Sequence, residues 1–154
     1  MGAVILRGIV VGGLGRGREF TSLAWVRAQF RARLNIDPHP GTLNLRLEAP
    51  HELATWGRLR AQPGVSIDPI SPEFCEARAY PAVVAKGSHF TSAGAANGLR
   101  AAIVLPDVPG YPRDRVELVA GVNLRQALGL ADGDVVTLWV AGSAPKGQGG
   151  VPPR

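Results

Sequence analysis

Thr42 and Asn44 are the two residues whose types and spacing best suit a chemical role. They lie two positions apart in an alternating segment, so an extended strand places the hydroxyl oxygen and the amide oxygen on one face. Hard, neutral oxygens of this kind suit Mg²⁺ that keeps water and phosphate as its other ligands. The same two residues also fit the solvent-facing side of an ordinary half-buried strand, so the pair alone leaves both interpretations open.

A glycine-rich segment after the first apolar run is the second candidate site. Residues 12–20 read Gly-Gly-Leu-Gly-Arg-Gly-Arg-Glu-Phe. Glycine permits positive φ and close approach of the backbone, so N–H groups can point at an anion, and Arg16 and Arg18 add positive charge. The segment lacks the Lys-Ser/Thr of the Walker motif and is not a clean dinucleotide fingerprint. It is either a phosphate-binding loop or a flexible connection.

Glu117 and Tyr111 are candidates farther along the chain. Glu117 lies between Val116 and Leu118, so strand alternation directs it to the opposite face, either into a pocket or toward water. A carboxylate in a pocket could accept the proton of a substrate hydroxyl. Tyr111 lies in the tight turn 107–114, where it could stack on a ring or simply pack.

Short strands joined by turns must position these residues, because 20 glycines and 13 prolines separate brief apolar runs. Apolar, β-branched or alternating runs predict strands over residues 4–11, 42–48, 65–67, 79–85, 99–105, 116–120 and 135–140. In the second of these, Leu43, Leu45 and Leu47 would face the core. The pattern favours a β-rich barrel or an α+β domain.

Helices are predicted at three places. Apolar residues at helical spacing predict one helix that begins after a cap at Thr21 or Ser22 and reaches Leu34. A shorter helix is predicted over 52–60, and another, capped by Asn123, over 124–130.

Composition limits the kind of protein. The 154 residues, 45% of them apolar, fit one domain, placed at 1–140, with a Gly/Pro-rich and disordered tail at 141–154. The net charge of +5 would attract nucleotides, nucleic acid or an acidic surface, or simply reflects a basic exterior. The single cysteine, Cys75, excludes an internal disulfide and indicates a reducing compartment. We expect a cytoplasmic protein without a membrane partner, because apolar runs of about 18 residues and signal-peptide features are lacking.

Three segments, taken together and in this order, carry a resemblance to a known family: Gly13–Phe20, Pro40–Leu45, and Val116–Ala120 followed by Leu124-Arg125 and residues 132–136. In this combination the chain resembles the archaeal CTP-dependent riboflavin kinases over roughly residues 4–140. The resemblance implies a mainly β fold with short helices, a six-stranded cradle-loop barrel of Greek-key character. It also implies transfer of the γ-phosphate of CTP to the riboflavin 5′-hydroxyl, giving FMN and CDP, with Mg²⁺ as cofactor.

The resemblance also implies roles for individual residues. Thr42 and Asn44 would bind Mg²⁺, and Glu117 would contact the flavin and could act as the base, with Tyr111 nearby. The residues that would contact the nucleotide are Gly13, Leu14, Gly15, Arg16, Gly17, Arg18, Val122, Asn123, Leu124 and Arg125. Two positions depart from the family pattern: Arg16 replaces an acidic residue, and residues 107–115 lack a threonine that meets the flavin.

Other functions stay open from the sequence. The same fold could carry a kinase of another small alcohol, or a nucleotide or flavin sensor without turnover. Residues 124–136 also look like the swapped-hairpin barrels of bacterial DNA-binding regulators, and the basic pI of about 10.3 would fit DNA. Those modules are much shorter, however, and they do not account for the Pro40–Asn44 element or the glycine-rich segment. Nucleic acid is therefore not the expected partner.

Overall fold

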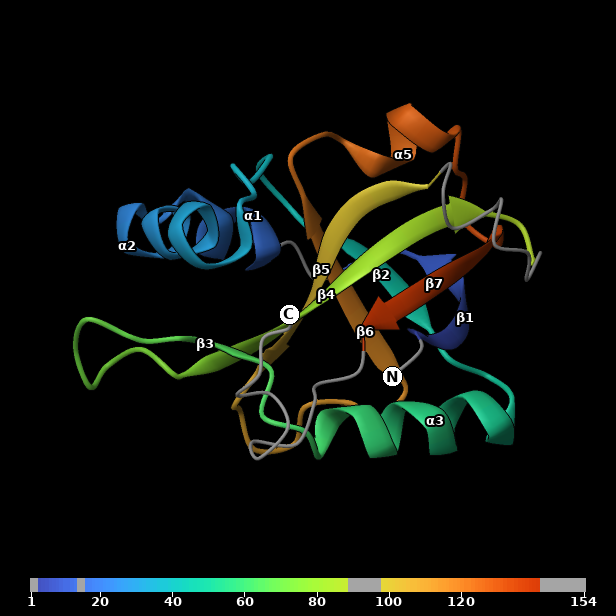
Figure 1. Ribbon diagram of the computed structural model, residues 1–154, viewed down its shortest axis with the longest axis horizontal. Helices are drawn as coiled ribbons and strands as arrows, with labels where there is room; N and C mark the ends of the chain where they lie inside the picture. Colours follow the sequence, from blue (N-terminus) through green and yellow to red (C-terminus); the bar gives the residue numbers. More distant parts are fainter. Residues whose placement is uncertain (1–2, 14–15, 89–97, 142–154) are drawn as a thin grey trace, which may run out of the picture.

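Six antiparallel strands close into a barrel (Figure 1). The computed structural model of the chain describes residues 3–13, 16–88 and 98–141. The barrel strands are β1 (Ala3–Val11), β2 (Leu43–Arg46), β4 (Ala77–Lys86), β5 (Leu99–Pro106), β6 (Arg115–Ala120) and β7 (Val135–Ala141). Their order is β4-β5-β6-β2-β1-β7, and β7 pairs with β4 to close the ring. The predicted six-stranded barrel, mainly β with short helices, is confirmed.

One further strand lies outside this ring. β3 (Val65–Ile67) pairs only with β4, in antiparallel register from Val65 opposite Ala79 to Ile67 opposite Ala77. Several barrel neighbours are distant in the sequence, since β2 pairs with β6 and β1 pairs with β7. These crossings bring the segment before β2 against the end of β6, which is where the candidate site lies.

The helices cover three parts of the barrel (Figure 1). α1 (Arg16–Ser22), α2 (Ala24–Gln29) and the π-helical turn η1 (Phe30–Leu34) form a layer beside the strands, α3 (Pro50–Arg60) crosses one end, and α5 (Leu124–Leu128) lies at the opposite end. Among the residues that the structure describes, every helix is too short or too polar to cross a bilayer.

The predicted helix is present from Ala24 to Leu34, as α2 followed directly by η1, but its predicted start at Thr21 or Ser22 was wrong. The helical layer begins at Arg16, and Leu23 interrupts it with extended backbone at φ −70° and ψ 131°. The Thr21 hydroxyl donates to Gly17 O at 2.8 Å and the Ser22 hydroxyl donates to Arg18 O at 2.7 Å. Both hydroxyls thus bond back to carbonyls one turn earlier within α1, so they belong to the first helix and do not cap the second, whose N-cap is Leu23.

The inside of the barrel holds the main core. Leu43, Leu45 and Leu47 are all buried there, which confirms the predicted inward face of β2. Trp56 of α3 meets Tyr80 of β4 edge to face, with ring centroids 5.8 Å apart, and closes one end. Loss of such buried side chains typically costs about 2–5 kcal/mol, so this core sets the stability of the fold.

A second apolar cluster fixes the helical layer on the outer face of β4, β5 and β6. Val26, Phe30 and Leu34 of α2 and η1 pack there against Ala102 and Val119. Phe20 of α1 packs against the same cluster, so tertiary packing, and not helix propensity alone, holds α1 against the barrel.

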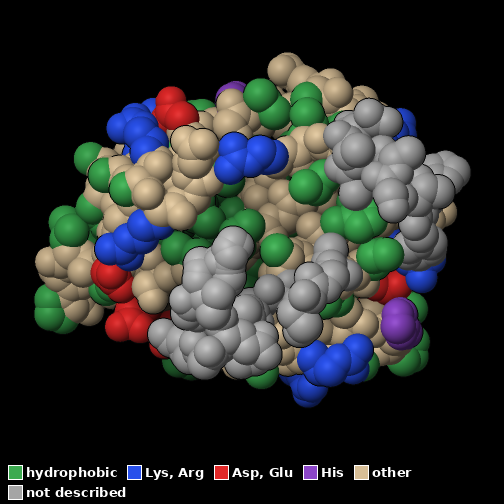
Figure 2. All heavy atoms as spheres, viewed as in Figure 1, with side chains coloured by type: hydrophobic (Ala, Val, Ile, Leu, Met, Phe, Trp, Pro, Cys, Tyr) green, Lys and Arg blue, Asp and Glu red, His purple; other side chains and the backbone are tan. Residues whose placement is uncertain are grey.

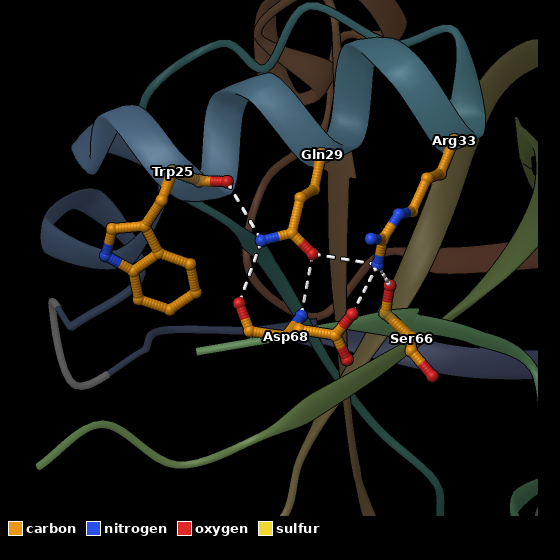
Figure 3. A network of polar contacts seen from close by, with 5 residues as sticks. All are labelled: Trp25, Gln29, Arg33, Ser66 and Asp68. Atoms are coloured by element: carbon orange, nitrogen blue, oxygen red, sulfur yellow. Dashed lines mark hydrogen bonds and ion pairs between the residues drawn. The ribbon is translucent and has the colours of Figure 1, made fainter. Parts of the chain in front are cut away.

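Polar contacts join the same layer to β3 (Figure 3). Gln29 Nε2 donates to Asp68 O at 2.8 Å, and Asp68 N donates to Gln29 Oε1 at 2.7 Å. Arg33 donates to Ser66 O at 2.7 Å and pairs with the Asp68 carboxylate at 2.9 Å. The Trp25 carbonyl accepts from Gln29 Nε2 at 3.2 Å. These bonds hold the helices that follow the glycine-rich segment in one orientation.

Candidate functional site

Strand pairing brings three of the predicted site residues together. Asn44 of β2 lies directly opposite Glu117 of β6, so the two side chains share the outward face of the barrel. The Thr42 hydroxyl donates to Glu117 Oε1 at 3.0 Å, and Asn44 Nδ2 lies 3.3 Å from Thr42 Oγ1. Asn44 is only 7% exposed although it faces away from the core. Residues 75 positions apart in the chain thus form one cluster of hydroxyl, amide and carboxylate groups.

Tyr111 completes this cluster from the turn before β6. Its hydroxyl donates to Glu117 Oε2 at 2.5 Å, while its ring packs partly against the barrel core. Burial raises the pKa of Tyr111 well above its usual value, and the hydrogen bond to Glu117 and the charge of that carboxylate raise it further, against the lowering effect of Arg115 and Arg60. Tyr111 therefore stays protonated and remains a donor to Glu117.

The glycine-rich segment packs against these side chains. A Cβ at Gly13 would lie 2.9 Å from Asn44 Cγ, and a Cβ at Gly17 would lie 2.5 Å from Thr42 Oγ1. The missing side chains therefore make room for the two oxygen-bearing residues. The prediction of a loop from Gly13 to Arg18 was partly wrong, because Arg16 begins α1 and Arg18 lies within that helix. Leu14 and Gly15 lie outside the described residues.

Thr21 links α1 to the turn before β2, a role that the sequence did not reveal. Its buried hydroxyl donates to Gly17 O and accepts from Gly41 N, each at 2.8 Å. Gly41 has a φ of +100°, a value that favours glycine, and this conformation directs its N–H toward α1. The spacing of four from Gly17 to Thr21 is the only sequence signal for this back-bonding contact.

A cleft of about 200 Å³ joins the three segments that carried the resemblance. Its lining residues come from α1, from the turn into β2, and from β6 through the start of α5: Arg18, His39, Pro40, Gly41, Thr42, Leu43, Leu118, Ala120, Val122, Asn123, Leu124 and Arg125. The structure therefore places four of the predicted nucleotide contacts, Val122–Arg125, in the same cleft as Arg18 and Thr42.

These four residues differ in what they offer to a ligand. Val122 is 47% exposed, whereas Leu124 is buried in the barrel core. The Asn123 side chain caps α5 by accepting from Gln126 N at 3.1 Å. Arg125 pairs with Asp132 at 2.6 Å. A ligand in the cleft would thus meet an apolar Val122 side chain and the half-exposed, already paired Arg125 guanidinium.

The donor set fits Mg²⁺ in its chemistry. Thr42 directs its hydroxyl proton at Glu117 and accepts a long hydrogen bond from Asn44 Nδ2, so one lone pair of its oxygen stays open to a cation. Asn44 presents its NH₂ group to Thr42, so its amide must turn for Oδ1 and Thr42 Oγ1 to face one ion. No group of three or more His, Cys, Asp and Glu side chains among the described residues is arranged to hold a metal. An ion here would take neutral oxygens, one carboxylate, water and phosphate.

Arg115 is a second residue that the sequence interpretation missed. It shares the outward face with Glu117, two positions later on β6, and its NH1 group donates to Asn44 Oδ1 at 3.4 Å. The signal was present in the sequence, because a strand places residues i and i+2 on one face. What links Arg115 to the site is its contact with Asn44, and this contact follows from the β2–β6 register, which the sequence does not show.

Comparison with known proteins shows the family of this chain. The family model CTP-dep_RFKase, described as Domain of unknown function DUF120, matches residues 10–140. The riboflavin kinase of Archaeoglobus fulgidus is 37% identical over 142 residues, 90% of this chain and 55% of the relative. That of Methanocella arvoryzae is 36% identical over 140 residues, 88% of this chain and 56% of the relative. That of Pyrobaculum arsenaticum is 39% identical over 138 residues, 90% of this chain and 61% of the relative.

The chain thus spans little more than half the length of these curated relatives. The matched range nevertheless contains the whole cluster around Glu117 and all the residues that line the 200 Å³ cleft. The chain belongs to the CTP-dep_RFKase family, that of the archaeal-type CTP-dependent riboflavin kinases.

Proposed function

We propose that this chain transfers the γ-phosphoryl group of CTP to the 5′-hydroxyl of riboflavin, giving FMN and CDP. The observation that carries the proposal is the hydrogen bond from Thr42 to Glu117, beside the cleft that also receives Arg18 and Val122–Arg125. Family membership and the similarity to riboflavin kinases support the identities of donor and acceptor.

In this proposal Glu117 accepts the proton of the acceptor hydroxyl. Thr42 and Tyr111 each donate to one of its carboxylate oxygens, which fixes the orientation of the carboxylate and leaves lone pairs on both oxygens. The 5′-oxygen of riboflavin bonds to the γ-phosphorus while the bond from that phosphorus to the β,γ-bridging oxygen breaks. The electron pair of the broken bond stays with CDP, and the hydroxyl proton passes to Glu117.

Positioning and charge do most of the work in such a reaction, since the transferred phosphoryl carries spread negative charge. Arg18, an exposed residue in the wall of the cleft, is the candidate to contact the nucleotide phosphates. Thr42 and Asn44 would hold Mg²⁺. When bound, the ion supplies charge neutralisation for the phosphates.

The flavin ring needs a larger apolar surface than the first cleft provides. A second cleft of about 830 Å³ lies between α3 and the turn that carries Tyr111, and is lined by Leu53, Trp56, Gly57, Arg60, Ala61, Arg113 and Asp114. The turn lacks the flavin-contacting threonine that the family resemblance implies. Apolar contacts of the flavin ring in this cleft would replace the contact with a threonine hydroxyl. Gly57 has open space around it, and Gly57→Leu should fill the cleft and weaken riboflavin binding without weakening CTP binding. Unchanged riboflavin affinity would place the ring elsewhere.

Phosphate transfer to riboflavin tests the proposal directly. Purified protein, Mg²⁺ and riboflavin are incubated with CTP, ATP, GTP or UTP, and FMN is followed by chromatography. FMN formed with CTP far faster than with the other donors supports the proposal. Comparable rates with ATP would contradict the choice of CTP. No FMN with any donor, while CTP still raises the melting temperature, would favour a different acceptor or a nucleotide sensor.

The distribution of charge supports a nucleotide ligand over DNA. On the face in Figure 2, basic side chains lie in separate groups with acidic side chains beside some of them. Many arginines are already paired: Arg27 and Arg31 with Asp37, Arg33 with Asp68, Arg46 with Glu48, and Arg125 with Asp132. A DNA-binding surface instead needs free cations aligned along a backbone.

A further inference from the structure

The guanidinium of Arg115 uses few of its hydrogen-bond donors within the described part of the chain. Its Nε is buried and has no hydrogen-bond partner among the described residues. Its NH1 group makes one long hydrogen bond, 3.4 Å, to Asn44 Oδ1. A guanidinium carries five N–H donors, and a buried donor without a partner destabilises the folded protein. The protein therefore maintains an unsatisfied cation beside the Thr42–Glu117 cluster.

Arg46 provides an internal comparison, because it lies directly opposite Arg115 in the β2–β6 register. Arg46 is exposed and makes two hydrogen bonds to Glu48 Oε2, at 2.6 Å and 3.2 Å. Arg115 is half-buried and forms no salt bridge with a carboxylate of the described residues. Two arginines on one face of the same strand pair thus differ in whether an anion already neutralises them.

The surroundings of Arg115 show which anion would suit it. Its guanidinium donates to the Asn44 amide oxygen, and Asn44 lies directly opposite Glu117 in the β2–β6 register. An anion bound to Arg115 would therefore lie within reach of the acceptor hydroxyl that Glu117 deprotonates. A planar guanidinium binds phosphate through two parallel hydrogen bonds, which suits a phosphoryl group between two oxygens.

We propose that Arg115 binds the transferred phosphoryl group, first as it leaves the nucleotide and then as the 5′-phosphate of FMN. The assignment rests on the proposed function, and it adds a residue outside the set that the family resemblance implies. The guanidinium supplies the positive charge that an arginine inserted in cis provides in other phosphoryl-transfer sites. The bond changes are those already described, since Arg115 donates hydrogen bonds and exchanges no proton.

Equilibrium binding of FMN and of riboflavin tests this assignment without turnover. Quenching of flavin fluorescence gives both affinities for the wild type, Arg115→Gln, Arg115→Lys and the control Arg46→Gln. The wild type should prefer FMN over riboflavin. Arg115→Gln should lose about 10- to 100-fold in FMN affinity with little change for riboflavin. Arg115→Lys, which keeps the positive charge but loses the planar pair of N–H donors, should have an intermediate FMN affinity. Arg46→Gln should keep the preference of the wild type.

A rate measurement provides a second readout. In single-turnover FMN formation with saturating CTP, Arg115→Gln should be slower by about 100-fold or more. Arg115→Gln or Arg115→Lys retaining the full FMN preference would overturn the assignment, as would a wild type that binds both flavins equally. The latter result leaves the proposed function in place if FMN is still formed from CTP. A wild type that binds neither flavin and forms no FMN would overturn both.

Discussion

The hydroxyl of Tyr111 donates to Glu117 Oε2 at 2.5 Å, so a residue of the turn and a residue of β6 are joined in one site. Thr42 holds the other carboxylate oxygen at 3.0 Å from a third part of the chain. A carboxylate with a hydrogen-bond donor at each oxygen cannot rotate freely. Its orientation toward the substrate hydroxyl is therefore fixed before the substrate binds. Such preorganisation is what a site for phosphoryl transfer requires.

Removal of the tyrosine hydroxyl should therefore slow FMN formation without unfolding the protein. For Tyr111→Phe we expect a fall in kcat of about 10-fold with little change in the KM for CTP, because the ring still packs while Glu117 loses one fixed donor. Glu117→Gln should lower kcat more, by about 100-fold or more, because it removes the carboxylate that we propose accepts the proton. Steady-state kinetics measure both. Wild-type kcat in Tyr111→Phe would show that the hydrogen bond has no part in turnover.

The raised pKa of Tyr111 predicts how stability changes at alkaline pH. The tyrosine ionises at the ordinary value of 10.0 in the unfolded chain but at a higher pH in the folded protein, chiefly because of burial. Its contribution to stability is fully present below pH 10 and is lost as the pH rises above that, by up to about 1.4 kcal/mol per pH unit.

Urea unfolding between pH 8 and pH 11 measures this effect. The wild type should lose stability above pH 10 more steeply than Tyr111→Phe, which has no proton to release there. Tyr80 also has a raised pKa, but it is present in both proteins and cancels from the comparison. Parallel stability curves for the two proteins would contradict the prediction.

Gly17 and Gly12 form a matched pair for testing the glycine-rich segment. A Cβ at Gly17 would lie 2.5 Å from Thr42 Oγ1, whereas a Cβ at Gly12 would have no other heavy atom within 4 Å. Gly17→Ala should displace the Thr42 hydroxyl and lower kcat/KM for CTP by about 10-fold or more. Its melting temperature should change little, because alanine in α1 gains up to about 1 kcal/mol of helix propensity. Equal kcat/KM in Gly17→Ala and Gly12→Ala would show that the close contact does not matter.

Much of the barrel could be predicted from the sequence, because alternation is a local signal. The leucines of β2 and the apolar runs of β4 to β7 stand in the sequence where the strands are. The closure of six strands came from the family resemblance, since pairing such as β1 with β7 joins opposite ends of the chain. The start of the helix before β2 was misplaced because the Thr21 and Ser22 hydroxyls bond back to carbonyls of α1, while the N-cap of α2 is Leu23, which has no capping side chain.

The candidate site divides in the same way. Thr42, Asn44 and Glu117 could be named from strand faces and resemblance, but their contact depends on the register between β2 and β6. The Tyr111 hydrogen bond depends on the path of the turn before β6. The missing hydrogen-bond partner of Arg115 Nε depends on which side chains the fold brings next to it. Neither leaves a pattern in the sequence, because both arise from tertiary packing.

The pair Thr42 and Asn44 should determine the response to divalent ions. Mn²⁺ serves as a spectroscopic substitute for Mg²⁺. Thr42→Ala, which removes the proposed oxygen ligand, should weaken Mn²⁺ binding in the presence of CTP by at least 10-fold. Thr42→Ser keeps the hydroxyl and should bind Mn²⁺ like the wild type. Asn44→Ala should have the same effect as Thr42→Ala. Electron paramagnetic resonance of free Mn²⁺ measures the affinity directly. Wild-type Mn²⁺ affinity in both alanine variants would remove these residues from the metal site.

Thr21 should govern both stability and the shape of the site, because it ties α1 to the turn at Gly41. Thr21→Val keeps the volume of the side chain but leaves Gly41 N without its acceptor at 2.8 Å. We expect the free energy of unfolding to fall by about 1–3 kcal/mol, and CTP affinity to fall with it as α1 moves away from Thr42. Thr21→Ser, which restores the hydroxyl, should recover both. Urea unfolding and CTP titration of the two variants check this, and a Thr21→Val protein with wild-type stability would show that water replaces the hydroxyl at no cost.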